Sequence, residues 1–468
     1  MRADSRRAIP SVDAVLRELG HVDVPHAAVV ALVRRELAGL RGEGEPVTAQ
    51  IAFGRVRSAL EELRGGRIRP VINGTGILVH TNLGRSPLGP QVVHAIEEIA
   101  ANYNNLEYDL AGGQRGERAT YLEHNLAVLC GAQAATVVNN CAAALLLVLR
   151  HFATSDRDEV VISRGELVQI GGGFRIPEIL EASGAKLREV GTTNKTSLSD
   201  YSRAISKRTG LILKVHRSNF YMAGFVESPG RSDLAALAGK KRVPFVEDLG
   251  SGATMRTEEV PGIEHEPTPA EVLRQGVDLV CYSSDKLFGG PQAGILAGRA
   301  KLVSALKREP FFRALRCDKL ILSALQMTVD LHLTDTRSIP VVAMLHESND
   351  ALRARAESIV AQLAGVPAAV QVGAGRAQIG GGTLPRSVIA SVTLDIRPRD
   401  LPLAELASRL RAGGPPVIGY LSGNRFKIDL RTVFPRQDGQ LVGAIRRAFG
   451  VGPTLPADRP SAGSARPT

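Results

Sequence analysis

Three short segments place chemically useful side chains directly after apolar, strand-like runs. They are N-N-C-A (139–142) after A-T-V-V, E-D-L-G (247–250) after V-P-F-V, and S-S-D-K (283–286) after D-L-V-C-Y. Because the carboxyl ends of parallel strands meet at the same edge of a sheet, these segments are expected to lie close together. The sequence therefore predicts one site that combines an anion-binding turn, an acid and a lysine.

Each of the three segments also has an ordinary structural interpretation. A lysine is usually a solvated surface charge, and an aspartate such as Asp248 often caps a turn. The turn at Asn140, Cys141 and Ala142 could simply begin a helix with small residues. It could also direct backbone N–H groups at a phosphate. It contains neither a G-x-G-x-x-G nor a Walker lysine pattern, so a dinucleotide or nucleoside triphosphate site is not supported.

Taken together, the three segments fit one cofactor. Pyridoxal 5'-phosphate needs a phosphate cup, an acid beside its pyridine nitrogen and a lysine that forms a Schiff base with its aldehyde. The segments occur in that order, with the spacing of fold-type I enzymes, and Asp248 and Lys286 supply the acid and the lysine. A metal site is less well supported because the histidines are scattered along the chain: His80, His94, His124, His151, His216 and His265.

The surrounding elements predict an α/β architecture with two further domains. Helical spacing and the caps Ser11 and Thr48 indicate a helical domain at 1–70, whose third helix is expected to bury Ile51, Val56, Leu60 and Leu63. Residues 71–325 alternate six short strands with helices, which is typical of a mainly parallel sheet. Residues 326–450 are expected to form a small α+β domain, with one long helix at about 341–365, and residues 451–468 a disordered tail.

Composition limits the class of protein. A chain of 468 residues with 44% hydrophobic and 22% charged residues is ordinary for a globular protein of several domains. The formal net charge of +11 favours polyanionic or phosphorylated partners. Four cysteines without C-x-x-C spacing, no apolar run behind the charged start and no bilayer-length apolar segment predict a cytoplasmic protein without a membrane association.

Long motifs across almost the whole chain resemble the bacterial L-seryl-tRNA(Sec) selenium transferases, also called selenocysteine synthases. The motifs appear in order and are therefore highly specific. One departure is Gln169, where an acidic residue is expected in many members. The resembling segments are I-N-G-T-G-I-L-V-H-T-N-L-G-R-S-P-L (72–88), Y-N-N-L-E-Y-D-L (103–110), G-E-L-V-Q-I-G-G-G-F-R-I-P (165–177), V-G-T-T-N-K-T (190–196), K-V-H-R-S-N-F (214–220), S-S-D-K-L-F-G-G-P-Q-A-G (283–294) and F-F-R-A-L-R-C-D-K (311–319).

The resemblance implies a role for each candidate residue. Lys286 would be the Schiff-base lysine, Asp248 the partner of the pyridine nitrogen, and Ser283 a further phosphate ligand beside the cup. His216 would neighbour the cofactor ring, although a buried, hydrogen-bonded histidine is an equally good interpretation. Arg85, Arg313 and Arg316 would bind selenophosphate, and Asp285 would be a catalytic residue that orients nearby groups. Arg313 and Arg316 are expected on one face of a helix.

The resemblance further implies the reaction and the partners. Serine esterified to tRNA(Sec) would be converted to selenocysteine with selenophosphate, through an aminoacryl-tRNA intermediate. The N-terminal helices would bind tRNA, and the protein would form a large homo-oligomer, a decameric ring of dimers. Two alternatives remain: a lyase of the same superfamily acting on a phosphorylated amino sugar or amino acid, and a non-catalytic nucleic-acid-binding protein. The helical extension favours the tRNA enzyme over the lyase, and the ordered cofactor segments argue against the binding protein.

Overall fold

The computed structural model describes residues 9–43, 47–170 and 173–452. The chain forms two compact units, Met1–Pro70 and Val71–Thr468. Within the described residues, no helix combines the length and the apolar character needed to cross a membrane. Most of the expected tail, from residue 453 onward, lies outside the described residues.

The first unit contains three helices: α1 (Val12–Leu19), α2 (His26–Gly42) and α3 (Ala49–Gly65). Ser11 and Thr48 cap α1 and α3 by accepting hydrogen bonds from backbone N–H groups, as their positions predict. The prediction for α3 was wrong at both ends, because Ile51 and Leu63 are exposed while Ala52 is buried beside Val56 and Leu60. Alanine occurs at both buried and exposed helix positions, so the sequence did not indicate that Ala52 belongs to the buried face of α3.

The second unit is built on a seven-stranded sheet with the order β5-β13-β12-β11-β10-β6-β9. All neighbouring pairs are parallel except those made by β13. The predicted strands are all present: β5 (Ala134–Val138), β6 (Glu159–Ser163), β9 (Lys186–Val190), β10 (Thr209–Val215), β11 (Phe245–Gly250) and β12 (Leu279–Ser283). The antiparallel strand β13 (Gly294–Gly298) was not predicted, since it begins and ends with glycine, a residue that is depleted in strands.

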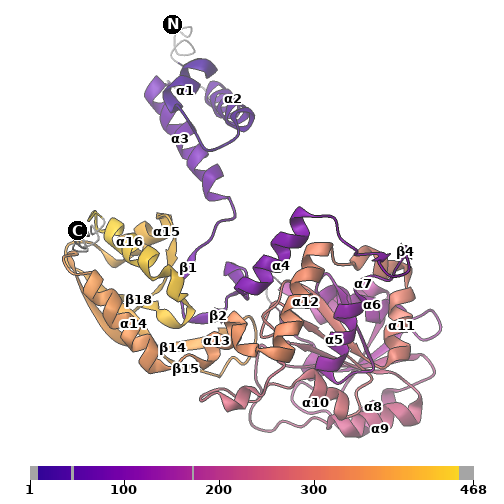
Figure 1. Cartoon of the computed structure of the whole chain (residues 1–468). Coiled ribbons are helices and arrows are strands. Elements are labelled where there is room, and N and C mark those ends of the chain that lie inside the picture. The colour runs from indigo at the N-terminus through magenta and orange to yellow at the C-terminus, as the bar shows by residue number, and fades with distance from the viewer. Residues whose placement is uncertain (1–8, 44–46, 171–172, 453–468) are drawn as a thin grey trace, which may run out of the picture. The chain divides into compact units, whose positions relative to one another are not determined.

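Helices cover both faces of this sheet, as Figure 1 shows. One face packs against α5 (Thr120–Cys130), α8 (Leu198–Ala204), α9 (Arg231–Lys241), α10 (Pro269–Arg274) and α12 (Lys319–Thr334). The other face packs against α6 (Cys141–Phe152), α7 (Ile176–Ser183) and α11 (Ala300–Arg308). The predicted α/β class with a mainly parallel sheet is therefore confirmed.

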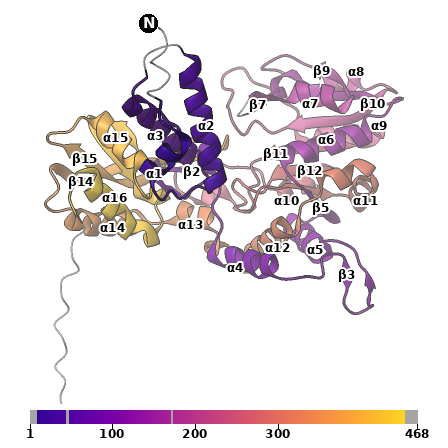
Figure 2. The same ribbon diagram turned by 90° about the horizontal axis from the view of Figure 1, so that it is seen from above.

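A second sheet of five strands has the order β17-β18-β15-β14-β2. Two of its strands, β14 and β15, are labelled in Figure 2. Its strands are β2 (Ile77–Val79), β14 (Ala368–Gly380), β15 (Ile389–Pro398), β17 (Tyr420–Ser422) and β18 (Arg425–Asp429). The nearby β1 (Ile72–Asn73) pairs with β16 (Val417–Ile418). Residues 72–79 were assigned to the large domain, but these strands pair with the C-terminal part of the chain. Sequence proximity could not reveal a pairing across about 300 residues.

The helices of the C-terminal part differ from the prediction in one place. The expected long helix is divided into α13 (Pro340–His346) and α14 (Asn349–Gln362), because Ser348 caps a new helix. The sheet packs against α14, α15 (Leu403–Ala412) and α16 (Asp438–Ala448). Two short hairpins complete the second unit: β3 (Tyr108–Asp109) with β4 (Gln114–Arg115), and β7 (Gln169–Ile170) with β8 (Phe174–Arg175).

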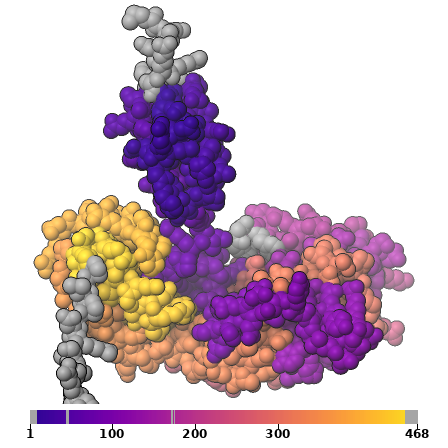
Figure 3. Space-filling model, turned by 45° about the horizontal axis from the view of Figure 1, so that its top comes forward, coloured from indigo at the N-terminus to yellow at the C-terminus, as the bar shows by residue number. Residues whose placement is uncertain are grey.

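Helix α4 (Pro90–Ala101) fixes the N-terminal segment of the second unit against the helices of the large sheet. It packs against α12, where the Ser323 hydroxyl donates to the carbonyl of Ala95. In the space-filling view, the purple segment that contains α4 lies on the surface beside orange residues (Figure 3). The segment between β2 and α4 carries Arg85, and the packing of α4 holds this segment in place.

Candidate active site

Lys286 is buried, with 5% of its surface exposed. The loop that carries it follows β12 and is held from three directions. The Ser86 hydroxyl donates to the carbonyl of Lys286, Leu287 N–H donates to the carbonyl of Ser251, and His332 hydrogen-bonds to the carbonyl of Phe288. The loop is therefore fixed by distant parts of the chain, and Lys286 is not a solvated surface lysine.

Asp248 lies on β11, the strand beside β12, and is also buried. Side chains alternate across a strand, so the neighbouring Glu247 faces the opposite side, where Arg231 of α9 binds it at 2.8 Å through two nitrogen atoms. Asp248 Oδ1 accepts hydrogen bonds from Gly250 N–H at 3.0 Å and from the Cys141 thiol at 3.5 Å. Only the second of the two consecutive acids therefore faces the site.

The electrostatic balance at Asp248 favours a cationic partner. Burial raises the pKa of Asp248, and the nearby Lys286 ammonium, the Cys141 thiol and the Gly250 N–H oppose that rise. Within the described residues, both hydrogen bonds to this carboxylate reach Oδ1, which leaves Oδ2 available to a further donor. A protonated ring nitrogen would supply such a donor together with the positive charge that the buried carboxylate lacks.

The predicted anion-binding turn is the N-terminus of α6. Asn140 caps the helix by accepting a hydrogen bond from Ala143 N–H at 2.8 Å. Cys141 and Ala142 supply the first backbone N–H groups of the helix, which have no partner within the helix itself. A Cβ added at Gly294 of β13 would lie 2.2 Å from the carbonyl oxygen of Asn140. Glycine at 294 is therefore required for β13 to pass this close to the turn.

Gly250 marks the space that these groups share. Its φ is +67°, a conformation that glycine adopts readily. A Cβ added at this position would lie 3.4 Å from Ser218 Oγ and 3.7 Å from Lys286 Nζ. The Lys286 amine and the Ser218 hydroxyl thus face the same small volume, directly beside the residue whose N–H binds Asp248. Ser283, also predicted, is buried at the end of β12.

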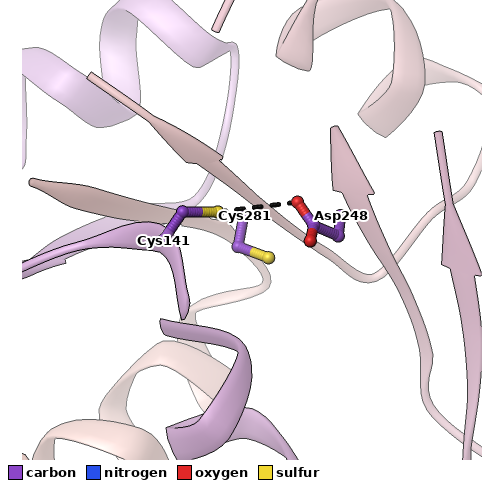
Figure 4. Close-up of side chains that lie close together, drawn as sticks. All are labelled: Cys141, Asp248 and Cys281. Atoms are coloured by element: carbon purple, nitrogen blue, oxygen red, sulfur yellow. Dashed lines mark hydrogen bonds between the residues drawn. The ribbon is translucent and has the colours of Figure 1, made fainter. Parts of the chain in front are cut away.

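Two cysteine thiols lie near the Asp248 carboxylate, and that of Cys141 hydrogen-bonds to it (Figure 4). The ligand atoms of Cys141, Asp248 and Cys281 lie within 4.8 Å of one another, a cluster that linear spacing did not reveal. Contact with Cys141 and burial raise the pKa of the Cys281 thiol well above its ordinary value. For Cys141, the Cys281 contact lowers the pKa but is outweighed by burial and by the Asp248 charge, so this pKa is raised as well. Both thiols are therefore protonated, and Cys141 acts as a hydrogen-bond donor to Asp248.

His216 follows β10, and its backbone lies beside that of Asp248, because the His216 N–H donates to the Asp248 carbonyl at 2.8 Å. Its imidazole is partly exposed and has Glu266 as a neighbour. Sequence analysis did not single out Glu266, Ser218 or Cys281. Cys281 is two residues from Ser283 on β12, a spacing that places side chains on the same side of a strand. Ser218 is two residues from His216, in a turn closed by the hydrogen bond from the Ser218 N–H to the His216 carbonyl. Glu266 belongs to a distant loop and had no such signal.

The structure divides the three arginines assigned to selenophosphate between two cavities, one of which also contains Asp285. Arg85 and Asp285 line a cavity of about 510 Å³, and their side chains form an ion pair of 2.7 Å. Arg313 and Arg316 line a separate cavity of about 290 Å³. These two arginines do not share an α-helical face: Arg313 lies in a short 3-10 helix (Pro310–Leu315), and Arg316 follows it in extended conformation.

Both arginine cavities are linked to the candidate cofactor site through the backbone, because Ser86 of the first cavity donates to the Lys286 carbonyl and the segment of Arg313 contacts Asn139. Asp285 precedes Lys286 in the sequence, and its Oδ1 is buried without a hydrogen-bond partner among the described residues. Arg85 has a positive φ of 65°. A non-glycine residue adopts this conformation only at an energetic cost, and such strained residues cluster at functional sites. On the other side, the Leu315 carbonyl accepts a hydrogen bond from Asn139 N–H at 2.9 Å, which ties the Arg313 segment to the start of α6.

The side chains present therefore fit pyridoxal phosphate. The N-terminus of α6 could bind the phosphate, and the buried acid Asp248, with an available oxygen, could pair with the ring nitrogen. The buried amine of Lys286 lies in the same space. Gln169, the departure from the expected pattern, accepts a hydrogen bond from Arg175 at 3.0 Å and lies in a surface hairpin. Its backbone carbonyl accepts a hydrogen bond from the Asn219 side chain at 2.7 Å, so the hairpin is tied to the segment that carries His216 and Ser218.

A comparison with solved structures defines the class of fold. The chain is similar to D-glucosaminate-6-phosphate ammonia-lyase, with a TM-score of 0.58, 18% identity, and coverage of 84% of this chain and 98% of that chain. At this identity, the likeness concerns the fold alone. Together with the parallel sheet and the position of Lys286 after β12, it defines the fold of the fold-type I pyridoxal phosphate enzymes.

Comparison of sequences defines the family. The family model described as L-seryl-tRNA selenium transferase matches residues 71–434. L-seryl-tRNA(Sec) selenium transferase of Carboxydothermus hydrogenoformans is 41% identical over 445 residues, covering 92% of this chain and 95% of the relative. The enzyme of Aquifex aeolicus is 42% identical over 433 residues, with 92% and 95% covered. The chain belongs to the L-seryl-tRNA selenium transferase family.

His332 supports the lysine loop and should make stability depend on pH. Its Nε2–H donates to the Phe288 carbonyl at 2.8 Å, and Nδ1 accepts from Thr254 at 3.1 Å. Burial lowers the pKa of His332 to about 4, from 6.5 in an unfolded chain. Between these values the unfolded state binds more protons, so this contribution to stability is present above pH 6.5 and is lost as the pH falls toward 4.

The shift corresponds to a loss of about 3 kcal/mol in the free energy of unfolding across that window. We expect His332→Phe to be less stable than the wild type at pH 8 but to lose less stability on acidification. Denaturant unfolding of the two proteins at pH 4.5, 6 and 8 would measure this difference. Equal losses on acidification would contradict the assigned role of His332.

Proposed function

We propose that this chain converts seryl-tRNA(Sec) to selenocysteyl-tRNA(Sec) with selenophosphate, using pyridoxal 5'-phosphate. The observation that carries the proposal is the burial of Lys286 beside Asp248 at the edge of the sheet, in a chain about 40% identical to named L-seryl-tRNA(Sec) selenium transferases over more than 90% of its length. We assign the catalytic role to residues 71–325 and place the reaction in the cytoplasm, where charged tRNA is used.

The residues that would hold the cofactor are those of the candidate site. The phosphate would bind at Asn140, Cys141 and Ala142, with Ser283 beside them, and Asp248 would pair with the ring nitrogen. When bound, pyridoxal phosphate supplies an electron sink that makes the α-proton of the seryl group acidic and allows its β-hydroxyl to leave. Burial of the site excludes water, which strengthens the interaction between Asp248 and a ring cation.

Lys286 would act both as the attachment point of the cofactor and as the base. With its Nζ free, Lys286 would be placed to accept the α-proton of the seryl group. The surrounding loop contacts at Ser86, Ser251 and His332 hold the lysine backbone still during this transfer. The overall exchange replaces the serine β-hydroxyl with selenium from selenophosphate and leaves phosphate as the second product.

Selenophosphate would be bound by Arg85, Arg313 and Arg316, with Asp285 orienting Arg85. Guanidinium groups suit a tetrahedral oxyanion because each can donate two hydrogen bonds. We also propose that the protein acts as a homo-oligomer, a decameric ring of dimers, as the family resemblance implies. In such an assembly, the arginine cavity of one subunit could adjoin the cofactor site of another. Sedimentation velocity of the purified protein would measure the assembly.

The first unit would bind tRNA. Several of its arginines are paired with acids, such as Arg57 with Glu18 and Arg55 with Glu43. Arg34, Arg41 and Arg69 are exposed and form no ion pair with a described residue, so they are free to contact phosphate groups. Contacts of this kind dominate the affinity of proteins for nucleic acids and weaken as salt concentration rises.

We expect a variant lacking residues 1–70 to retain the visible absorbance of bound pyridoxal phosphate. It should bind seryl-tRNA(Sec) at least about 10-fold more weakly, because each phosphate contact that is lost no longer releases counterions from the tRNA. Filter binding at several salt concentrations would measure affinity, and selenocysteine formation from seryl-tRNA and selenophosphate would measure activity. The absorbance serves as the control for folding. Unchanged tRNA affinity would show that the first unit does not bind tRNA.

A further inference from the structure

Glu266 is a buried carboxylate in contact with a residue of the candidate site. Only 1% of its side chain is exposed, and its Oε1 lies 3.2 Å from His216 Nε2. The two atoms are close enough for an ion pair, but their geometry is not that of a hydrogen bond, and Oε1 has no hydrogen-bond partner among the described residues. A buried carboxylate oxygen without a donor is energetically costly, so this contact is incomplete as it stands.

The loop that carries Glu266 is built to direct this side chain inward. Thr257 is fully buried; its hydroxyl accepts a hydrogen bond from Glu266 N–H at 2.8 Å and donates to the Glu264 carbonyl at 2.7 Å. The two preceding side chains face outward, where Glu264 pairs with Arg386 and His265 with Glu258. The backbone position of Glu266 is therefore fixed independently of His216, and α10 begins three residues later at Pro269.

His216 connects this carboxylate to the cofactor site. Its backbone N–H donates to the Asp248 carbonyl, and its carbonyl accepts from the N–H of Ser218. The hydroxyl of Ser218 faces the space shared with Lys286 beside Gly250. His216 is thus the residue between the buried carboxylate and the groups that would surround the cofactor, while its ring is still partly exposed and free to adjust.

We propose that Glu266 is a positioning residue that holds the His216 imidazole in place beside the bound cofactor; this rests on the proposed pyridoxal phosphate function. Hydrogen bonds at active sites are often poorly aligned in the empty protein and tighten when the ligand binds. A small rotation of the imidazole would align Nε2–H with Oε1, satisfy the unpaired oxygen and fix the ring orientation. The carboxylate then acts on the cofactor only through His216.

A double-mutant cycle separates this role from a general structural one. Glu266→Gln keeps the size of the side chain but removes its charge, and it is made in the wild type and in His216→Phe. The dissociation constant of pyridoxal phosphate is measured for each purified protein from the change in absorbance, without any assay of activity. Glu264→Gln, on the same loop but with 46% of its side chain exposed, is the matched control.

We expect Glu266→Gln to weaken cofactor binding about 10-fold in the wild type and less than about 2-fold in His216→Phe, and the control to have no effect. Equal losses in the two backgrounds, or no loss in either, would overturn the proposal. If Glu266→Gln does not fold, Glu266→Asp in the same two backgrounds makes the same comparison, because it moves the carboxylate away from the ring.

A second measurement distinguishes failure of this inference from failure of the proposed function. The thermal midpoint of the cofactor-free proteins reports the Glu266–His216 contact by itself. A wild type that binds no pyridoxal phosphate would contradict the proposed function, and with it the positioning role. The contact itself would still be supported if Glu266→Gln lowered the thermal midpoint in the wild type but not in His216→Phe. Midpoints that are independent of the His216 background would overturn the contact as well.

Discussion

Replacing Lys286 with alanine is expected to abolish the visible absorbance of the purified protein and to lower the rate of selenocysteyl-tRNA formation by about 1,000-fold or more. Lys286 is 5% exposed, and its amine faces the space beside Gly250, where Ser218 and Asp248 also lie. An alanine removes both the amine that would attach the cofactor and the base for the α-proton. The absorbance spectrum and single-turnover kinetics with seryl-tRNA would measure the two losses separately.

Two further variants make this prediction specific. Lys286→Arg keeps the positive charge near Asp248 but cannot form the Schiff base, so it should fold like the wild type and still lack the absorbance. Lys301→Ala removes an exposed lysine at the start of α11 and should change neither property. A colourless wild type that cannot be reconstituted with pyridoxal phosphate would contradict the cofactor assignment, and a coloured, active Lys286→Ala would contradict the role of the lysine.

Replacing Asp248 with asparagine is expected to lower the turnover rate by about 100-fold, an effect typical of removing one preorganised electrostatic group from an active site. The amide keeps the size of the side chain and can still accept from Gly250 N–H. It no longer carries the negative charge that would keep a ring nitrogen protonated. Because the cofactor would remain attached to Lys286, the variant should retain visible absorbance, and its turnover should fall more than its cofactor affinity.

The adjacent Glu247 provides a matched control, since it is equally buried but faces the other side of β11. Glu247→Gln breaks the buried pair with Arg231, which should cost about 3 to 5 kcal/mol of stability. It should leave the turnover of the folded protein near that of the wild type. Thermal melts and turnover, measured on Asp248→Asn and Glu247→Gln, would test whether the first variant loses mainly turnover and the second mainly stability. An Asp248→Asn protein with turnover within about 3-fold of the wild type would show that Asp248 does not act on the ring.

Much of the large domain could be predicted from the sequence because its signals are local. Apolar runs marked six of the seven strands of the large sheet, and the rule that parallel strands end at one edge brought together the segments of Asn140, Asp248 and Lys286. The exception, β13, begins and ends with glycine, which weakens its signal as a strand, and it runs antiparallel to its neighbours. In the first unit, Ser11 and Thr48 were recognisable as caps because capping depends on residues three positions apart.

The sequence by itself predicted which residues would carry the chemistry: the lysine, the acid and the helix N-terminus, each defined by its own short segment. Only the tertiary structure decided that Lys286 is buried, that Arg85 lies in a different cavity from Arg313, and that Glu266 reaches His216 from a loop fifty residues away. It also placed β2 in the C-terminal sheet. The reason is physical: caps and strand periodicity depend on neighbours along the chain, whereas burial and side-chain contacts depend on packing between segments that the sequence separates.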